Sequence, residues 1–290
     1  MRTPLLPCAT AALCLLAAGP APADDGVKVG LTPNVFHVPS GKSLKKAAAP
    51  FESLLESTTG VSGEAVEGGD ASGLAAKLKG GKVQLGAFSG IEFAWAKKAN
   101  PKLEPLLLCV NESRKVRALL LVRASSDFKK PGDLAGRVLA VPTEQRGHCT
   151  IFLERKCVGN STPKKFYKKV LSSADVEEAV DEVVDGNADA AVVDGLAWSS
   201  YREGKPGAAK KLRVLLDSGP VPSPVVAYQP GRLDDATRKR IRDGLLGSKD
   251  TKRGRQLLNQ LRLTGFEVPP DGFAKELAAV TKEFPPPASE

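Results

Sequence analysis

The sequence is poor in the side chains that most often carry catalysis and metal binding. It has two histidines, five cysteines and one methionine among 290 residues, and only 5% of its residues are aromatic. It contains no Cys-x-x-Cys pair and no clustered histidines, so the spacing typical of a structural zinc site is missing. The scarcity of aromatic residues argues against a surface that stacks nucleic-acid bases. We therefore expect no metal, no cofactor and no nucleic-acid partner.

A long hydrophobic run is missing as well. The chain begins with Arg2, an apolar stretch over residues 9–18 and the small residues Ala21-Pro22-Ala23, which together are typical of a secretory signal over residues 1–23. The apolar stretch is far shorter than the roughly 20 residues that span a bilayer, and no later segment is as apolar. We expect a protein that is exported, periplasmic or otherwise outside the cytoplasm, and soluble after signal cleavage.

Basic residues outnumber acidic ones and give a formal net charge of +9. A positive field attracts anions over long distances. The densest basic stretch, residues 238–255, is interrupted by Asp243 and Asp250 and contains no aromatic side chain, so it is typical of solvated helix faces. The charge therefore suits a small anionic ligand or an anionic membrane surface.

Three cysteines follow the expected signal: Cys109, Cys149 and Cys157. An odd number leaves at least one thiol unpaired. If residues 147–157 form one helix, Cys149 and Cys157 lie about 12 Å apart along its axis, which is beyond disulfide reach. A bridge between them needs that helix to end early, and the sequence leaves both arrangements open.

Short runs of β-branched residues or leucine alternate with segments of helical period from residue 27 to residue 228. The expected strands are residues 27–31, 83–88, 106–110, 118–123, 138–142, 190–194, 212–217 and 225–228. The alternation predicts mostly parallel sheets flanked by helices. After Tyr228 the pattern predicts helices only, at residues 234–246, 251–261 and 273–284.

We therefore expect an α/β fold of two lobes joined by two crossing strands, near residues 122–125 and 218–223. Lobe one is expected to comprise residues 24–122 and 223–290, and lobe two residues 123–222. The second crossing contains Gly219-Pro220-Val221-Pro222-Ser223-Pro224, whose extended, proline-stiffened backbone suits a hinge.

Four stretches resemble the phosphate/phosphite/phosphonate-type periplasmic substrate-binding proteins of ABC transporters. They are residues 81–90, residues 130–141 with their Asp133-Leu134-Ala135-Gly136 segment, residues 183–194, and residues 218–226 followed by 233–246. The resemblance implies the type II periplasmic-binding-protein fold and ligand capture between the lobes. It also implies delivery to an ABC permease in the membrane. We expect a monomer without catalytic residues.

The ligand site is expected beyond the carboxyl ends of the strands, where helix N-termini offer free N–H groups to an anion. The candidate residues are Asn34, Phe88, Ser89 and Gly90 from lobe one, and Thr143, Gln145, Arg146, Gly147, His148, Thr150 and Asp194 from lobe two. Neutral donors together with a cation suit phosphate, phosphite or a phosphonate.

One departure from the family pattern concerns the anion loop. The family's Ser-Thr-Ser-Gly-like sequence is replaced here by Glu144-Gln145-Arg146-Gly147, which keeps the glycine and loses the hydroxyl groups. Glu144 would repel an anion if it pointed inward, whereas Arg146 would attract one. A carboxylate or a cationic ligand therefore stays open.

Two other functions fit parts of the sequence. A sensory or standalone binding protein would have the same fold and a signalling partner. A secreted enzyme would use Cys149 or Asp194, but adjacent side chains on a helix diverge, so His148 is poorly placed to activate Cys149 and only the fold could bring His37 there. No Gly-x-Ser-x-Gly motif occurs either. We expect no enzymatic activity.

Overall fold

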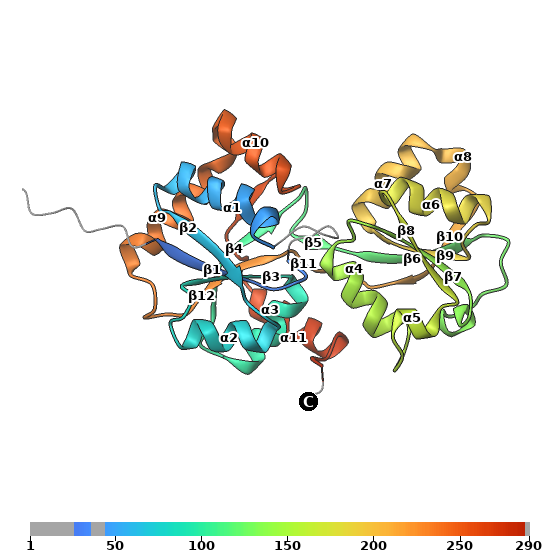
Figure 1. Cartoon of the computed structure of the whole chain (residues 1–290), viewed down its shortest axis with the longest axis horizontal. Coiled ribbons are helices and arrows are strands. Elements are labelled where there is room, and N and C mark those ends of the chain that lie inside the picture. Colours follow the sequence, from blue (N-terminus) through green and yellow to red (C-terminus); the bar gives the residue numbers. More distant parts are fainter. Residues whose placement is uncertain (1–25, 36–43, 288–290) are drawn as a thin grey trace, which may run out of the picture.

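The computed structural model describes residues 26–35 and 44–287 as two lobes, each built on one sheet (Figure 1). The signal expected at residues 1–23 and the residue His37 lie outside the described residues. Among those described, no helix is both long and apolar enough to span a membrane.

The first lobe contains a six-stranded sheet in the order β13-β4-β12-β3-β1-β2. Strands β1, β2 and β3 are parallel, whereas β12 is antiparallel to β3 and β4. The carboxyl ends of β1 and β3 therefore meet at one edge of the sheet. The strands are β1 (Val27–Leu31), β2 (Gly63–Glu67), β3 (Leu85–Phe88), β4 (Glu104–Val110), β12 (Val225–Tyr228) and β13 (Gly265–Glu267).

Helices cover both faces of this sheet (Figure 1). One face carries α1 (Leu44–Thr59), α9 (Asp235–Leu246) and α10 (Lys252–Gln260), and the other carries α2 (Ala71–Lys79), α3 (Gly90–Ala99) and α11 (Phe273–Glu283). Buried apolar side chains of α1, such as Phe51 and Leu54, share a core cluster with Ile241 and Leu245 of α9. This burial of apolar area holds the C-terminal helices on the first lobe.

The second lobe contains a five-stranded sheet in the order β10-β6-β9-β7-β8, with β7 parallel to β8 and β9. Its strands are β6 (Ala118–Arg123), β7 (Val138–Pro142), β8 (Lys169–Ser173), β9 (Ala190–Asp194) and β10 (Leu212–Asp217). One face is covered by α6 (Val176–Asp185), α7 (Gly195–Gly204) and α8 (Pro206–Ala209), and the other by α4 (Gly147–Phe152) and α5 (Pro163–Phe166). A π-helical turn (Leu153–Cys157) continues α4.

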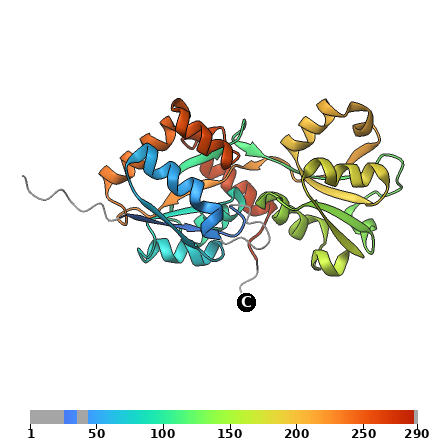
Figure 2. The same cartoon turned by 45° about the horizontal axis from the view of Figure 1, so that its top comes forward.

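Two strands cross between the lobes and pair with each other (Figure 2). They contain β5 (Lys115–Val116) and β11 (Val221–Pro222), which are antiparallel. Next to them, the backbone N–H of Ser223 donates to the carbonyl of Arg114 at 3.0 Å. The predicted α/β fold of two lobes with two crossing strands is confirmed.

The position of the first crossing differs from the expectation. Strand β6 pairs with β9 and β10 over its whole length, so the chain enters the second sheet before Ala118 and not at residues 122–125. An apolar run predicts a strand, but it does not say which sheet the strand joins.

Three strands of the two large sheets were not predicted: β2, β8 and β13. Residues 265–267 were expected outside any strand, yet β13 pairs with β4. All three lie at an edge of their sheet, where fewer side chains are buried and apolar runs are correspondingly short. Both sheets are also mixed, because β12 and β6 run antiparallel to their neighbours.

Candidate functional site

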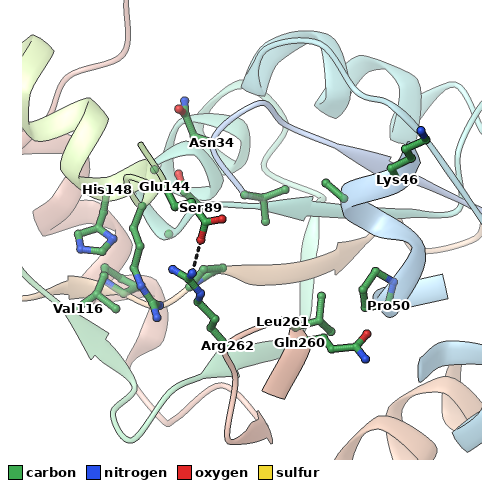
Figure 3. Close-up of a pocket in the computed structure, with 17 residues that line it drawn as sticks. Asn34, Lys46, Pro50, Ser89, Val116, Glu144, His148, Gln260, Leu261 and Arg262 are labelled. Atoms are coloured by element: carbon green, nitrogen blue, oxygen red, sulfur yellow. Dashed lines mark hydrogen bonds and ion pairs between the residues drawn. The ribbon is translucent and has the colours of Figure 1, made fainter. Parts of the chain in front are cut away.

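A pocket of about 290 Å³ lies between the two lobes (Figure 3). Lobe one contributes the turn after β1, the first half of α1 with Lys46, Ala47 and Pro50, the N-terminus of α3 and the C-terminal end of α10. Lobe two contributes the loop between β7 and α4, and the crossing strands add Val116 and Pro222. Both lobes therefore line a single cavity.

A buried carboxylate organises the lobe-one wall. Glu92, which is 3% exposed, accepts hydrogen bonds from Asn34 Nδ2 at 2.9 Å and Thr32 Oγ1 at 2.7 Å. Ser89 caps α3: its backbone N–H and hydroxyl donate to the Glu92 carboxylate, and its Oγ accepts from the Glu92 N–H at 3.3 Å. Hydrogen bonds to the Glu92 carboxylate therefore fix the positions of Asn34 and Ser89. The first N–H groups of α3 have no acceptor within the helix.

Glycines allow the two lobes to approach closely at this pocket. A Cβ on Gly147, the first residue of α4, would lie 1.9 Å from the carbonyl oxygen of Asn34. A Cβ on Gly90 would lie 2.0 Å from the carbonyl oxygen of Pro222. Real Cβ atoms do not come that close to backbone, so any larger residue at position 147 would force the lobes apart.

Some charged side chains of the pocket are paired with each other, and Arg146 is not. Glu144 of lobe two and Arg262 of lobe one form an ion pair across the cleft (Figure 3). Arg146 also lines the pocket, and its guanidinium makes no hydrogen bond or ion pair with any of residues 26–35 and 44–287. Glu144 is therefore offset by a partner, whereas the Arg146 guanidinium remains able to bind a ligand.

His148, Cys149 and Asp194 lie together behind the Arg146 side of the pocket. His148 Nε2 is 3.0 Å from Asp194 Oδ2 and 3.4 Å from Cys149 Sγ, so the expectation that the adjacent side chains of His148 and Cys149 diverge is wrong. The other carboxylate oxygen of Asp194 caps α7 by accepting from the N–H groups of Leu196 at 2.9 Å and Ala197 at 3.2 Å. Each of these three residues is buried, at 7% exposure or less.

The environment shifts the pKa of two of these groups in opposite directions. Burial raises the pKa of Asp194, but the hydrogen bond from His148, the charges of His148 and Arg146 and the N–H of Ala197 outweigh it, so the pKa lies below its ordinary value. Burial, followed by the charge of Asp194, raises the pKa of the Cys149 thiol well above its ordinary value. This shift favours the neutral thiol form of Cys149 at neutral pH.

The structure brings most of the candidate residues to this region. Six line the pocket: Asn34, Ser89, Gly90, Arg146, Gly147 and His148. Asp194 contacts His148 and lines two adjoining cavities of about 460 and 210 Å³. Gln145 lines the smaller cavity, where Thr150 Oγ1 donates to its side chain at 3.5 Å.

Two candidates lie elsewhere. Phe88 is 0% exposed in the core, with its ring 5.8 Å from that of Phe93. Thr143 donates to the carbonyl of Ser173 on β8 at 2.7 Å. The open question about the cysteines also has an answer, because Cys109, Cys149 and Cys157 are all free thiols.

Glu92 and Arg262 are among the residues that shape the pocket and were missed by sequence reasoning. Glu92 was signalled by the Ser89-x-x-Glu92 spacing of a capping box, which predicts a helix start but not the bonds to Asn34 and Thr32. Arg262 follows α10 far from the other site residues in the chain, and no local pattern connects it with Glu144. Only the fold brings Arg262 next to Glu144.

Comparison with known proteins gives one family. The family model of periplasmic substrate-binding proteins of phosphonate ABC transporters matches residues 35–271. A search of curated proteins gave no match.

Solved structures resemble the chain in fold. XAC2383 from Xanthomonas citri, bound to chloride, is 18% identical with a TM-score of 0.59, over 90% of this chain and 98% of its own. PhnD1 from Prochlorococcus marinus, in complex with methylphosphonate, is 14% identical with a TM-score of 0.56, over 90% and 98%. A binding protein component of an ABC phosphonate transporter from Pseudomonas aeruginosa is 16% identical with a TM-score of 0.54, over 88% and 84%.

The family match spans most of the chain, and its two-lobed relatives share the fold described above. This family consists of transport proteins that bind solutes and work with ABC permeases, and it is not a family of enzymes. The chain belongs to the periplasmic substrate-binding proteins of phosphonate ABC transporters.

Proposed function

We propose that the protein binds a small phosphorus oxyanion, such as phosphate, phosphite or an alkylphosphonate, in the pocket between its lobes. The ligand is then delivered to an ABC permease by a monomer outside the cytoplasm. The observation that carries this proposal is the Arg146 guanidinium, which lines a pocket built by both lobes and has no partner among the described residues. A guanidinium makes strong bidentate hydrogen bonds to such oxyanions.

The lobe-one wall supplies complementary donors. The N-terminus of α3 begins at the pocket with Gly90, and a helix N-terminus favours an anion through its N–H groups and its dipole. Asn34 is oriented by Glu92, and His148 faces the same cavity from lobe two. An anion between these groups would touch both lobes at once.

Contact with both lobes is what would let the ligand favour the closed form of the protein. A ligand shifts an equilibrium between open and closed lobes only by its preference for the closed form. Because Arg146 belongs to lobe two and the N-terminus of α3 to lobe one, an anion gains both sets of contacts only when the lobes meet. The close approach of Gly147 to Asn34 is consistent with such a closed form.

The complex of PhnD1 with methylphosphonate makes methylphosphonate the first ligand to test on this chain. A ligand at about 100 times its Kd stabilises the folded protein by about 2.7 kcal/mol. We expect a thermal shift with methylphosphonate, phosphite or phosphate, and no shift with acetate or with a cationic amine. A response to the amine alone would contradict the proposal.

Arg146→Ala tests the residue that carries the proposal. Hydrogen bonds to a charged group contribute about 1.5–3 kcal/mol each, so we expect the Kd for the anion to rise about ten- to hundredfold. Arg253→Ala is the matched control, because Arg253 is exposed at the end of α10 opposite to the pocket-lining Gln260. If both variants bind the anion as the parent does, the site lies elsewhere.

A sensory role for the same fold is not favoured, because the matching family model is one of ABC transport proteins. Enzymatic use of Cys149 is not favoured, because its thiol is buried and neutral.

A further inference from the structure

Three side chains with different metal-binding atoms converge next to the anion pocket. The His148 Nε2, the Cys149 Sγ and a carboxylate oxygen of Asp194 all lie within 4.8 Å of one another. They come from the N-terminus of α4 and the carboxyl end of β9, and each is buried. This cluster belongs to lobe two and shares one residue, His148, with the proposed anion pocket.

The spacing fits a tetrahedral ion. With metal–ligand bonds of about 2.0–2.3 Å to nitrogen, oxygen and sulfur, two ligand atoms around such an ion lie roughly 3.4–3.6 Å apart. The observed separations are 3.4 Å between Nε2 and Sγ and 3.0 Å between Nε2 and Oδ2. Small side-chain rotations are therefore enough to admit an ion between the three atoms.

We propose that His148, Cys149 and Asp194 form a binding site for a divalent transition-metal ion, with Zn²⁺ the best chemical match. Nitrogen, sulfur and carboxylate oxygen are the ligands that Zn²⁺ takes in proteins, and sites with three protein ligands keep a fourth position open. When the metal bonds form, the thiol loses its proton to solvent, and the Nε2 proton of His148 moves to solvent or to Nδ1, so binding releases at least one proton. This site goes beyond the proposed anion capture and does not require it.

The structure supports the site in two further ways. The two carboxylate oxygens of Asp194 have different partners: Oδ1 caps α7, and Oδ2 points to His148. The hydrogen bonds to Oδ1 fix the orientation of Asp194 as a metal ligand. Cys149 and Asp194 also line the cavity of about 210 Å³, which gives the fourth position room for water or a small ligand.

Arg146 is the group that opposes a cation here. Its positive charge acts on both Cys149 and Asp194. The thiolate and the carboxylate of Asp194 together balance a divalent ion, so Arg146 keeps its charge available to an anion. The metal and the anion are therefore compatible neighbours.

The test uses the full mature chain without a histidine tag, stripped of metal by a chelator and kept free of phosphorus oxyanions. We expect calorimetry to give one Zn²⁺ per chain. Cobalt titration should give the near-ultraviolet absorption of a thiolate–cobalt bond. Because even a supporting partner of a metal ligand is worth about tenfold in affinity, Cys149→Ser should weaken binding by at least that factor and abolish the absorption.

Cys157→Ser is the matched control, because Cys157 is also a buried free thiol but is absent from the cluster. It should bind both metals as the parent does. Asp194→Asn provides a second variant that keeps a capping oxygen for α7 and should also weaken binding. A parent that binds no Zn²⁺, or Cys149→Ser and Asp194→Asn variants that bind it unchanged, would overturn the site without affecting the proposed anion binding.

Discussion

Glu144 and Arg262 form an ion pair across the two lobes although 118 residues separate them in the chain. Glu144 lies in the loop after β7, and Arg262 lies just after α10 in a left-handed backbone conformation with φ of 54°. Both line the pocket. The pair joins the lobes at the pocket and offsets a carboxylate that would otherwise repel an anion.

Breaking this pair should favour separated lobes in the ligand-free protein. The side chains are 38% and 60% exposed, and exposed pairs contribute about 0.2–1 kcal/mol. We therefore expect Glu144→Gln to lower the ratio of closed to open molecules by up to about fivefold. Small-angle X-ray scattering at low salt should show a larger mean radius of gyration, and salt should remove the difference.

A matched control breaks exposed ion pairs within one helix. Asp243→Asn removes the partner of Lys239 and Arg242 on α9 without touching the cleft. Its scattering should equal that of the parent. Identical curves for Glu144→Gln and the parent would show that the pair does not hold the lobes.

The fold was predictable where strands are central and apolar. β6 and β9 are buried over nearly their whole length and β7 at three of its five residues, and burial on both faces produces the continuous apolar runs that identify them. The edge strands β2, β8 and β13 carry too few apolar residues for such a signal. The sheet to which β6 belongs depends on its partners β9 and β10, which no local pattern specifies.

Gly147→Ala should prevent the lobes from meeting as they do here. The new Cβ would lie 1.9 Å from the carbonyl oxygen of Asn34 and 2.6 Å from its Cβ, and backbone cannot yield as a flexible side chain can. We expect weaker anion binding and a larger radius of gyration with ligand present, while each lobe remains folded. Calorimetry and scattering with methylphosphonate measure both effects.

Gly204→Ala makes the same chemical change in lobe two, where a Cβ meets nothing within 4 Å. This control should bind and compact as the parent does. Normal ligand-induced compaction of Gly147→Ala would mean that the two lobes meet differently in the bound state.

The rule that ligands bind beyond the carboxyl ends of strands predicted part of the candidate site. Asn34, Ser89 and Arg146 follow strands whose carboxyl ends face the cleft, which is why the general rule for open sheets located them. The rule could not tell Phe88 from Ser89, because the last residue of a strand points to one face or the other. It also could not find Arg262, whose place depends on how α10 packs on α1.

Phe88 should act on stability through the core. It is fully buried against Phe93, and truncation of a buried phenylalanine to alanine costs about 3–5 kcal/mol. We expect Phe88→Ala to lower the free energy of unfolding in urea by that amount. A loss below about 1 kcal/mol, accompanied by weaker anion binding, would instead place the ring in the cleft.

Asp133 belongs to the segment at residues 130–141 that resembles the family, and its role in this structure is to hold a turn. Its carboxylate accepts from the N–H groups of Lys129 at 2.7 Å and Lys130 at 3.1 Å. These two backbone hydrogen bonds hold the pKa of Asp133 below its ordinary value. The ionised form is therefore favoured by folding.

The sign of the pH dependence follows from that direction. A carboxyl group whose pKa is lower in the folded than in the unfolded state stabilises the fold above the unfolded value of about 3.9, and this stabilisation is lost as the pH falls through the folded value. Asn resembles the protonated carboxyl group in shape. Urea unfolding should therefore find Asp133→Asn less stable than the parent at pH 7, with a difference that shrinks toward pH 3.

Asp271→Asn is the control, since Asp271 is exposed and its side chain makes no hydrogen bond with the described residues. A stability difference between Asp133→Asn and the parent that stays constant with pH would show that the charge of Asp133 is not what holds the turn.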